Sequence, residues 1–196
     1  MKKNKIVCII LLIIAFISLL INAVLILKDY TLVPDNEEEI ERKWLIDISN
    51  IPFDLDSAVK FDIVQTYINF FPEIRIRNIN NGSYYVLTIK SNMSVDGLIR
   101  DEKEYYISEE EYNHLLSKQE GNTINKTRYQ INYDNEIYEI DVFHDQLEGL
   151  AYLEIEFESE DKAREYNAPD WVIKEVTDDI NYKNGHLARF GIPKSQ

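Results

Sequence analysis

The sequence predicts a mostly β domain (α+β), in which an antiparallel sheet carries a few covering helices, preceded by one transmembrane helix. Three observations lead to this expectation. From Glu39 onward the dominant hydrophobic period is two, which is typical of strands. Two short segments carry the signals of helix N-termini. Residues 6–27 are apolar except at Ser18 and Asn22, and no charge interrupts them.

The apolar run at 6–27 is long enough to cross a bilayer. As a helix it would reach about 33 Å, and because it is apolar on every face it suits a membrane better than a protein core. A cleaved signal peptide is the alternative. Its apolar region would be shorter and would end at a small-residue site, whereas this run continues past Ala23 to Leu27.

The charges around this run predict its orientation. Three lysines precede it and acidic residues dominate after it, so residues 1–5 are expected as a cytoplasmic leader and the rest of the chain outside the cytoplasm. The protein is therefore expected to be a single-pass membrane protein. Residues 28–36 would form a linker, and 37–193 the domain. The three lysines are Lys2, Lys3 and Lys5.

Alternation of apolar and polar residues predicts eight strands, at 39–48, 61–69, 73–79, 83–91, 98–107, 123–133, 136–143 and 151–158. Asn80-Asn81-Gly82 and Tyr133-Asp134-Asn135 suit hairpin turns. Ser108, followed by three glutamates, predicts a helix that runs to about Lys118. Ser159 begins a second short helix that ends before Pro169.

Composition narrows the function classes. A net charge of −14 argues against a non-specific nucleic-acid binder, because phosphate backbones would be repelled. The single cysteine, Cys8, lies in the apolar run, which excludes an intrachain disulfide framework and thiolate zinc sites. The three histidines are scattered along the chain, which argues against a metal site built from histidines. Any metal is therefore expected to bind oxygen ligands.

Charged residues fall in register along the expected strands. Arg75 and Arg77 share one face of their strand, and Glu154 and Glu156 share one face of theirs. For a single strand, a solvated sheet face is the ordinary explanation. Seven such strands, with paired bases and paired carboxylates, favour a closed sheet whose charged face lines a tunnel and whose apolar face is covered.

Such a tunnel has a definite chemistry. Paired basic side chains suit phosphate oxygens, and arginine binds them in bidentate geometry. Clustered carboxylates without histidine or cysteine suit Mg²⁺ or Mn²⁺. The acidic composition is therefore compatible with a phosphate ligand that arrives together with a metal.

The strands also carry an ordered series of motifs. Residues 39–43 read ExExK, and the series continues with QTYIN (65–69), EIRIR (73–77), LTIKS (87–91), RDEKE (100–104), KTRY (126–129), EIDVF (139–143), LEIEF (153–157) and EVTDDINYKNGHLA (175–188). This series resembles the CYTH superfamily, the triphosphate tunnel metalloenzymes, and in particular its short bacterial members. The resemblance spans residues 37 to about 193 and excludes the apolar run.

The resemblance implies a fold, an activity and a set of roles. The fold would be an eight-stranded antiparallel β-tunnel, and the activity the metal-dependent hydrolysis of inorganic tripolyphosphate or a related small triphosphate. Catalytic roles fall on Lys43, Tyr67, Glu104 and Asp141, the last two by binding a second metal or orienting the attacking water. Metal ligands would be Glu39, Glu41, Glu154 and Glu156. The phosphate chain would be bound by Lys43, Arg75, Arg77, Lys90, Arg100, Lys126, Arg128 and Lys183, the last of these on a helix that plugs one tunnel end.

The sequence departs from the family pattern at three places. Thr66 stands where the family has glycine, and Asn125 where it has glutamate; both are expected to alter packing at the tunnel mouth. Ile180-Asn181 replace a pair that ends in arginine, which is expected to affect substrate preference. Two other functions stay open: a class IV-type adenylate cyclase, and a membrane-tethered module that binds polyphosphate or nucleotide without turnover. No pattern in the sequence indicates an oligomeric state.

Overall fold

In a computed structural model, residues 37–92 and 98–194 are described, and strands dominate them. The strands are β1 (Glu37–Ile46), β2 (Val59–Phe70), β3 (Glu73–Ile79), β4 (Tyr84–Asn92), β5 (Ile99–Ile107), β6 (Glu120–Tyr133), β7 (Glu136–Phe143), β8 (Ala151–Glu156) and β9 (Val172–Glu175). The α-helices are α2 (Glu109–Leu116), α3 (Glu160–Glu165) and α4 (Asn184–Phe190). Short 3-10 helices are η1 (Ile48–Asn50), η2 (Leu55–Ser57), η3 (Asp145–Leu147) and η4 (Ile180–Tyr182).

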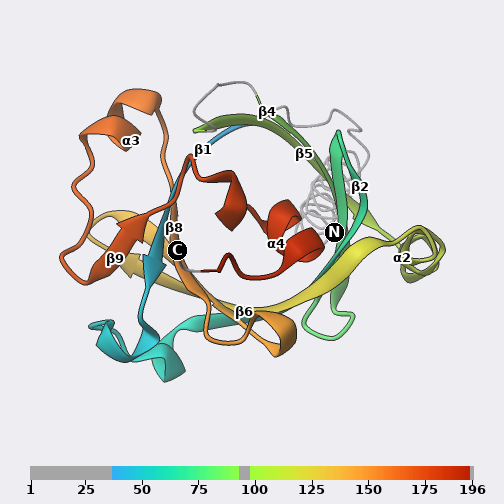
Figure 1. Cartoon of the computed structure of the whole chain (residues 1–196), viewed down its shortest axis with the longest axis horizontal. Helices are drawn as coiled ribbons and strands as arrows, with labels where there is room; N and C mark the ends of the chain where they lie inside the picture. Colours follow the sequence, from blue (N-terminus) through green and yellow to red (C-terminus); the bar gives the residue numbers. More distant parts are fainter. Residues whose placement is uncertain (1–36, 93–97, 195–196) are drawn as a thin grey trace, which may run out of the picture. The chain divides into compact units, whose positions relative to one another are not determined.

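Eight of the strands close into an antiparallel barrel. Their order is β5-β4-β3-β2-β6-β7-β8-β1, and β1 pairs back onto β5, where Glu39 lies opposite Arg100. Strand β9 pairs with the last residues of β1 and adds a ninth strand beside the ring. Figure 1 looks down the barrel and shows this ring. The predicted mostly β fold, an eight-stranded antiparallel barrel, is confirmed.

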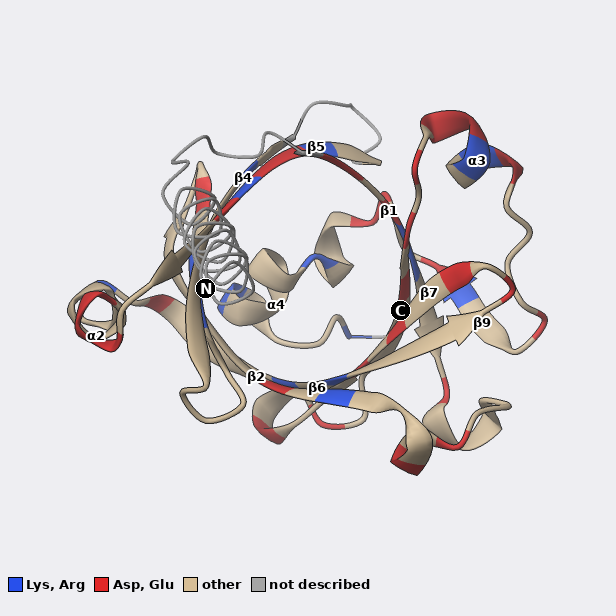
Figure 2. Cartoon of the chain, turned by 180° about the vertical axis from the view of Figure 1, so that it is seen from behind, with Lys and Arg blue, Asp and Glu red and all other residues tan. Residues whose placement is uncertain are grey.

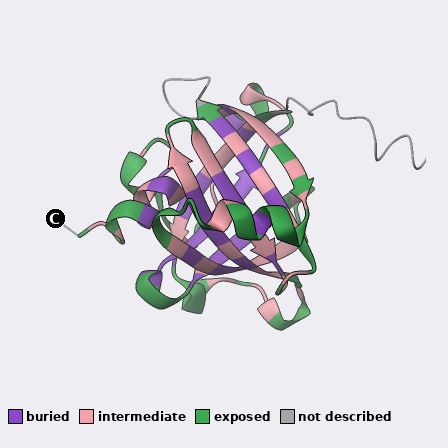
Figure 3. Ribbon diagram, turned by 90° about the vertical axis from the view of Figure 1, so that its right-hand side faces the viewer, coloured by how far each residue is buried: buried purple, intermediate pink, exposed green. Residues whose placement is uncertain are grey.

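The main hydrophobic core lies on the outer side of the barrel wall. Trp44, Ile140, Leu153 and Ile155 belong to one buried cluster, together with Ala163 of α3. Buried and less buried residues alternate along the tilted strands, as Figure 3 shows. Because side chains two apart share a face, this outer apolar packing directs the charged residues of β1 and β8 to the inside.

Helix α4 lies within the ring of strands in the view down the barrel (Figure 1). Its residues Leu187 and Ala188 are buried in a second cluster with Tyr67, Phe143 and Tyr152. The helix approaches β6 closely at Gly121, whose φ is +70° and where an added Cβ would lie 2.8 Å from the carbonyl oxygen of Ala188. Only glycine fits both the left-handed backbone and this contact.

The local predictions hold with small shifts of boundary. Helix α2 has the expected capping box, in which Ser108 and Glu111 satisfy each other's backbone N–H groups. Both hairpin turns have positive φ values, at Asn80 and Asn81 and again at Asp134 and Asn135. The first predicted helix ends at Leu116 rather than near Lys118, and the predicted strand at 39–48 ends at Ile46, where η1 follows. Strand periodicity did not reveal β9.

Three predicted segments lie outside the described residues: the leader at 1–5, the membrane helix at 6–27 and the linker at 28–36. Among the residues that the structure describes, no helix combines the length and the apolar character needed to cross a bilayer.

Candidate functional site

The barrel encloses a cavity of about 880 Å³ whose lining is strongly charged. Basic and acidic residues are interleaved along the strands that surround it, as Figure 2 shows. All of the bases that the sequence assigns to phosphate binding line it: Lys43, Arg75, Arg77, Lys90, Arg100, Lys126, Arg128 and Lys183. Glu104 lines it as well, and so do all four predicted metal ligands: Glu39, Glu41, Glu154 and Glu156.

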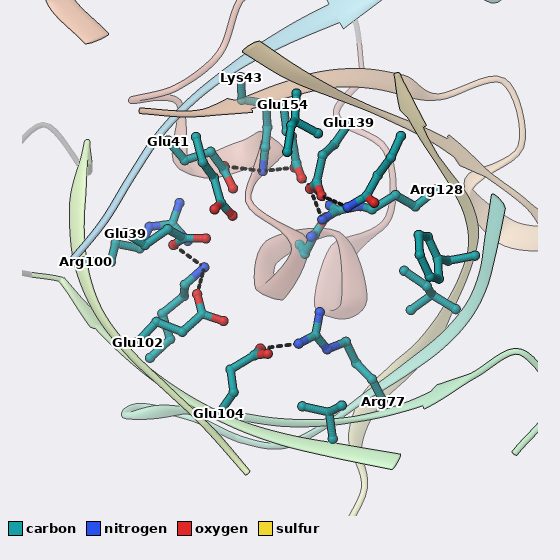
Figure 4. Close-up of a pocket in the computed structure, with 18 of the residues that line it drawn as sticks. Glu39, Glu41, Lys43, Arg77, Arg100, Glu102, Glu104, Arg128, Glu139 and Glu154 are labelled. Carbon is teal, nitrogen blue, oxygen red and sulfur yellow. Dashed lines mark hydrogen bonds and ion pairs between the residues drawn. The ribbon is translucent and has the colours of Figure 1, made fainter. Parts of the chain in front are cut away.

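Most of these charges are paired with a charge of opposite sign on the same strand or on another strand of the barrel. Nζ of Lys43 lies 2.7 Å from Glu154 and 3.4 Å from Glu41. Nζ of Lys90 lies 2.6 Å from Glu102 and also contacts Glu39. Figure 4 shows Lys43, Glu41 and Glu154 pointing into one part of the cavity and Glu39 and Glu102 into the adjoining part. The depth in the tunnel at which each strand presents its charged side chains is thus set by its register with the neighbouring strands.

Arg128 is held by the largest number of carboxylates. Its Nε and Nη2 each lie 2.7 Å from an oxygen of Asp141, a bidentate pair. The same guanidinium contacts Glu139 and Glu154. Burial opposes its charge, but these carboxylates raise the pKa of Arg128 well above its ordinary value. Arg128 is therefore a fixed cation, and its plane is set by Asp141.

Two arginines of the lining have hydrogen-bond donors that a ligand could use. The Nε atoms of Arg75 and Arg77 are buried and have no acceptor among the described residues. Their terminal nitrogens are partly used, by Glu102 at 3.2 Å from Arg75 and by Glu104 on Arg77. A buried, unpaired N–H costs free energy, so an incoming anion with several oxygens would be stabilised here.

Three carboxylates form a group that fits a divalent cation. One oxygen each of Glu39, Glu41 and Glu156 lies within 4.8 Å of the others. Enclosure in the tunnel, together with the negative charges of Glu139, Glu39 and Glu41, raises the pKa of Glu156 to about 8. Ionisation of all three carboxylates together is therefore unfavourable without a cation, and a bound cation would relieve their mutual repulsion. An all-oxygen donor set is the set that Mg²⁺ and Mn²⁺ prefer.

Glu154, the fourth predicted metal ligand, is placed differently. Lys43 and Arg128 both bind it, and these cations hold the pKa of Glu154 well below its ordinary value despite its burial. It is not part of the group of three. Lys43 in turn stays protonated, because Glu154 and Glu41 outweigh burial and raise its pKa. Lys43 is thus a permanent cation here, and the metal-binding role of Glu154 stays a prediction.

Two predicted catalytic residues lie behind the lining rather than in it. Tyr67 is fully buried; its hydroxyl accepts a hydrogen bond from the Gln65 amide, and its ring stacks on Phe70 beneath α4. Asp141 is also fully buried, and Lys126 and Arg128 engage both of its carboxylate oxygens. Their catalytic roles stay predictions, and neither side chain is part of the cavity lining.

Glu104 lies at the cavity and is bound to Arg77 and to the Thr88 hydroxyl, 2.8 Å away. Burial would raise its pKa, but the Arg77 guanidinium lowers it. A carboxylate with a lowered pKa is a weak proton acceptor near neutral pH. Glu104 is therefore suited to orient Arg77.

Lys183 enters the cavity from the segment that leads into α4. Burial and the positive charges of Arg100 and Lys43 lower its pKa to about 7. Its protonation therefore changes near neutral pH, whereas the pKa values of Lys43, Arg75, Arg100 and Arg128 are raised. Residues Ile180 and Asn181, which replace a pair ending in arginine, are exposed and do not line the cavity.

Several acids in the lining were given no role by sequence reasoning, and two of them, Glu102 and Glu139, each engage bases of the site. Glu102 pairs with Lys90 and Arg75, and Glu139 pairs with Arg128 and accepts a hydrogen bond of 2.7 Å from Gln130. Both stand in the inward register of their strands, two residues from Glu104 and Asp141. That register was the signal that could have identified them.

Comparisons with known proteins agree with this geometry. The model of the CYTH domain matches residues 37–184. An inorganic triphosphatase of Nitrosomonas europaea is 37% identical over 152 residues, which cover 76% of this chain and 96% of the relative. An inorganic triphosphatase of Acetivibrio thermocellus is 33% identical over 155 residues, or 78% of this chain and 94% of the relative.

A solved structure is similar as well. The crystal structure of the inorganic triphosphatase NE1496 superposes with a TM-score of 0.55 at 33% identity, and the match covers 76% of this chain and 93% of that one. The domain match covers most of the chain, the relatives are matched over nearly their whole length, and the fold is a closed barrel with a charged interior. The chain therefore belongs to the CYTH domain family.

Proposed function

We propose that this protein is a hydrolase that cleaves a phosphoric anhydride bond of inorganic tripolyphosphate or a related small triphosphate, with Mg²⁺ or Mn²⁺ as cofactor. The single observation that carries the proposal is the meeting of two sets of side chains in one cavity. Buried bases with unused N–H donors line the same cavity as three carboxylates whose oxygens are within 4.8 Å of one another. The relatives named inorganic triphosphatases support the same substrate class.

The chain's own residues supply positioning and charge neutralisation, which phosphoryl transfer chiefly needs. Arg75, Arg77 and Arg128 would bind the non-bridging phosphate oxygens, and Asp141 and Glu104 keep two of these guanidinium groups in place. A divalent cation held by Glu39, Glu41 and Glu156 would offset phosphate charge and lower the pKa of a water molecule. Lys43, buried and protonated, adds a fixed positive charge nearby.

The test is an assay of phosphate release by the purified full chain. With tripolyphosphate, we expect turnover in Mg²⁺ or Mn²⁺ and none in excess EDTA. ATP is assayed in parallel for both phosphate and cyclic AMP. Formation of cyclic AMP without phosphate release would identify a cyclase instead. Tight binding of tripolyphosphate with no turnover under any metal would identify a binding module and defeat the proposal.

We also propose that residues 6–27 anchor the chain in a membrane and that the domain at 37–193 lies outside the cytoplasm. The uncharged apolar run and the lysines that precede it support this orientation. Protease added to intact spheroplasts is expected to digest the domain. If the domain is digested only after lysis, the orientation is wrong; if it washes off the membrane at high salt, the anchor is wrong.

A further inference from the structure

Tyr152 of β8 is a fully buried polar residue that lies outside the cavity lining. It shares the inward face of its strand with Glu154, because the two are two residues apart. It lies opposite Leu45 of β1 on one side and opposite Asp141 of β7 on the other, and its ring packs edge-on against Phe143 at a centroid distance of 5.1 Å. The strands of the site therefore fix the ring, and its hydroxyl and one of its faces contact other partners.

The face of the Tyr152 ring lies next to the ammonium group of Lys43. Nζ of Lys43 is 5.3 Å from the ring centroid, a distance at which a cation is attracted to the π electrons. The same Nζ lies 2.7 Å from Glu154. Burial and the charge of Glu154 raise the pKa of Tyr152, so the phenol stays neutral and keeps an O–H group to donate.

The hydroxyl of Tyr152 donates a hydrogen bond of 3.1 Å to the carbonyl oxygen of Tyr182. That carbonyl belongs to the peptide bond that joins Tyr182 to Lys183, so the bond holds the backbone from which Lys183 enters the cavity. Lys183 also begins α4, since its own carbonyl accepts a hydrogen bond of 3.0 Å from the N–H of Leu187. The bond to Tyr152 thus ties the start of α4 to the barrel wall.

Lys43 and Lys183 carry like charges and come from distant parts of the chain. Burial, the charge of Arg100 and the charge of Lys43 lower the pKa of Lys183, so the two ammonium groups are close enough to repel each other. Glu41 and Lys90 are the other charged groups that face Lys183. Without a fixed contact, repulsion would move the later segment away from the barrel wall. A side chain that contacts both segments opposes this movement.

We propose that Tyr152 is a positioning residue for phosphate binding, which holds Lys183 at a set distance from Lys43 through its hydroxyl at one end and its ring face at the other. This inference rests on the proposed function, because it needs a phosphate chain in the tunnel. It adds to that function a buried residue that determines how tightly the phosphate chain binds. A lysine that occupies its binding position only part of the time lowers the apparent affinity by that fraction.

The experiment is a double-mutant cycle on the full chain, assayed with tripolyphosphate and Mg²⁺ at pH 6, where Lys183 is charged. Tyr152→Phe removes the hydroxyl and keeps the ring. We expect KM to rise about fivefold and kcat to stay within about twofold of wild type. In the Lys183→Met background, the same substitution should change KM by less than about 1.5-fold, because the lysine that Tyr152 positions is absent. A merely structural loss of a buried hydrogen bond would raise KM equally in both backgrounds.

Two further variants complete the design. Tyr138→Phe is the matched control, because Tyr138 is also buried and its hydroxyl is hydrogen-bonded to Tyr166 in the outer core; it should leave KM and kcat unchanged. Tyr152→Leu removes the ring as well as the hydroxyl. Its kcat should be about fivefold below that of Tyr152→Phe, because Lys43 loses the π face beside its ammonium group.

The outcomes separate the two proposals. An unchanged KM in Tyr152→Phe, an equal rise in both backgrounds, or equal kcat values in the Phe and Leu variants would overturn the positioning role while the proposed function stands. Absence of tripolyphosphate turnover in the wild type would overturn the proposed function and the positioning role with it.

Discussion

At the scale of single residues, the three-carboxylate group makes metal dependence the sharpest expectation. Glu41→Gln should lower the rate at least ~100-fold, because it removes a charge that holds the cation beside the phosphates. Steady-state assays of phosphate release over a range of Mg²⁺ concentration measure this. Glu110→Gln, on the exposed surface of α2, is the control and should behave as wild type. Full activity of the wild type in a chelator would contradict the assignment.

The inward bases give a second expectation. Arg77→Ala should reduce kcat/KM by about 100-fold, because a buried cation with a free Nε donor is lost from the phosphate site. The fold should persist, since removing one of several like charges relieves repulsion from Arg75 and Arg128. Lys118→Ala, at an exposed position outside the barrel, should have no kinetic effect. Equal effects of the two substitutions would show that the inward face is misassigned.

The lowered pKa of Lys183 predicts that the contribution of this residue to KM depends on pH. Its pKa of about 7 leaves it charged at pH 6 and mostly neutral at pH 8, so its attraction for a phosphate anion falls as the pH rises through 7. The groups that face it are Arg100, Lys43, Glu41 and Lys90. The ratio of KM in Lys183→Met to KM in wild type should be about tenfold at pH 6 and approach one at pH 8. A ratio independent of pH would mean that Lys183 does not titrate in this range.

The inward-facing charges were predictable because alternation along a strand determines on which face of the sheet each side chain lies. The alternation does not determine how deep in the tunnel a side chain lies. Tyr67 and Asp141 share the inward register of lining residues on their strands, yet one lies under α4 and the other behind Lys126 and Arg128. Depth depends on strand stagger, which only the register between β2, β6 and β7 defines.

At the scale of elements, the contact between α4 and β6 can be tested through glycine. Gly121→Ala combines a left-handed backbone with a Cβ that would lie 2.8 Å from a carbonyl oxygen, so it should lower the free energy of unfolding by about 2–4 kcal/mol. Gly149→Ala has a similar φ of +88° but no atom within 4 Å, and should cost only about 1 kcal/mol. Urea denaturation measures both. Equal losses of unfolding free energy in the two variants would show that α4 can move away from the added Cβ without destabilising the protein.

Elements with strong periodicity were predicted, and the others were not. The eight barrel strands alternate over six residues or more, whereas β9 has only four residues, three of them exposed, and shows no alternation. Helix α4 has seven residues and contains a glycine, so its sequence has neither the length nor the propensity of a helix. Its position inside the ring followed from the family resemblance, not from its own pattern.

At the scale of the whole molecule, closure of the barrel is the feature that local sequence could least predict. The charged stripes on individual strands fit an open sheet or a tunnel equally well until β1 pairs with β5. That pairing joins residues about sixty positions apart, such as Glu39 and Arg100. No turn or loop length encodes it. The motif series implied the closed form, and in the structure closure pairs the backbone edges of β1 and β5 that an open sheet would leave exposed.

The place of β1 between β5 and β8 also sets the order in which the chain can become a barrel. The first strand to leave the ribosome has no complete set of neighbours until β8, beginning at Ala151, has been synthesised. At about 5–20 residues per second, that delay is on the order of ten seconds. During it, the edge of β1 that pairs with β8 stays unpaired, and contacts so distant in sequence also slow the folding itself. The same closure that assembles the site therefore leaves a strand edge of the nascent protein open to aggregation for longer than in a domain built from neighbouring hairpins.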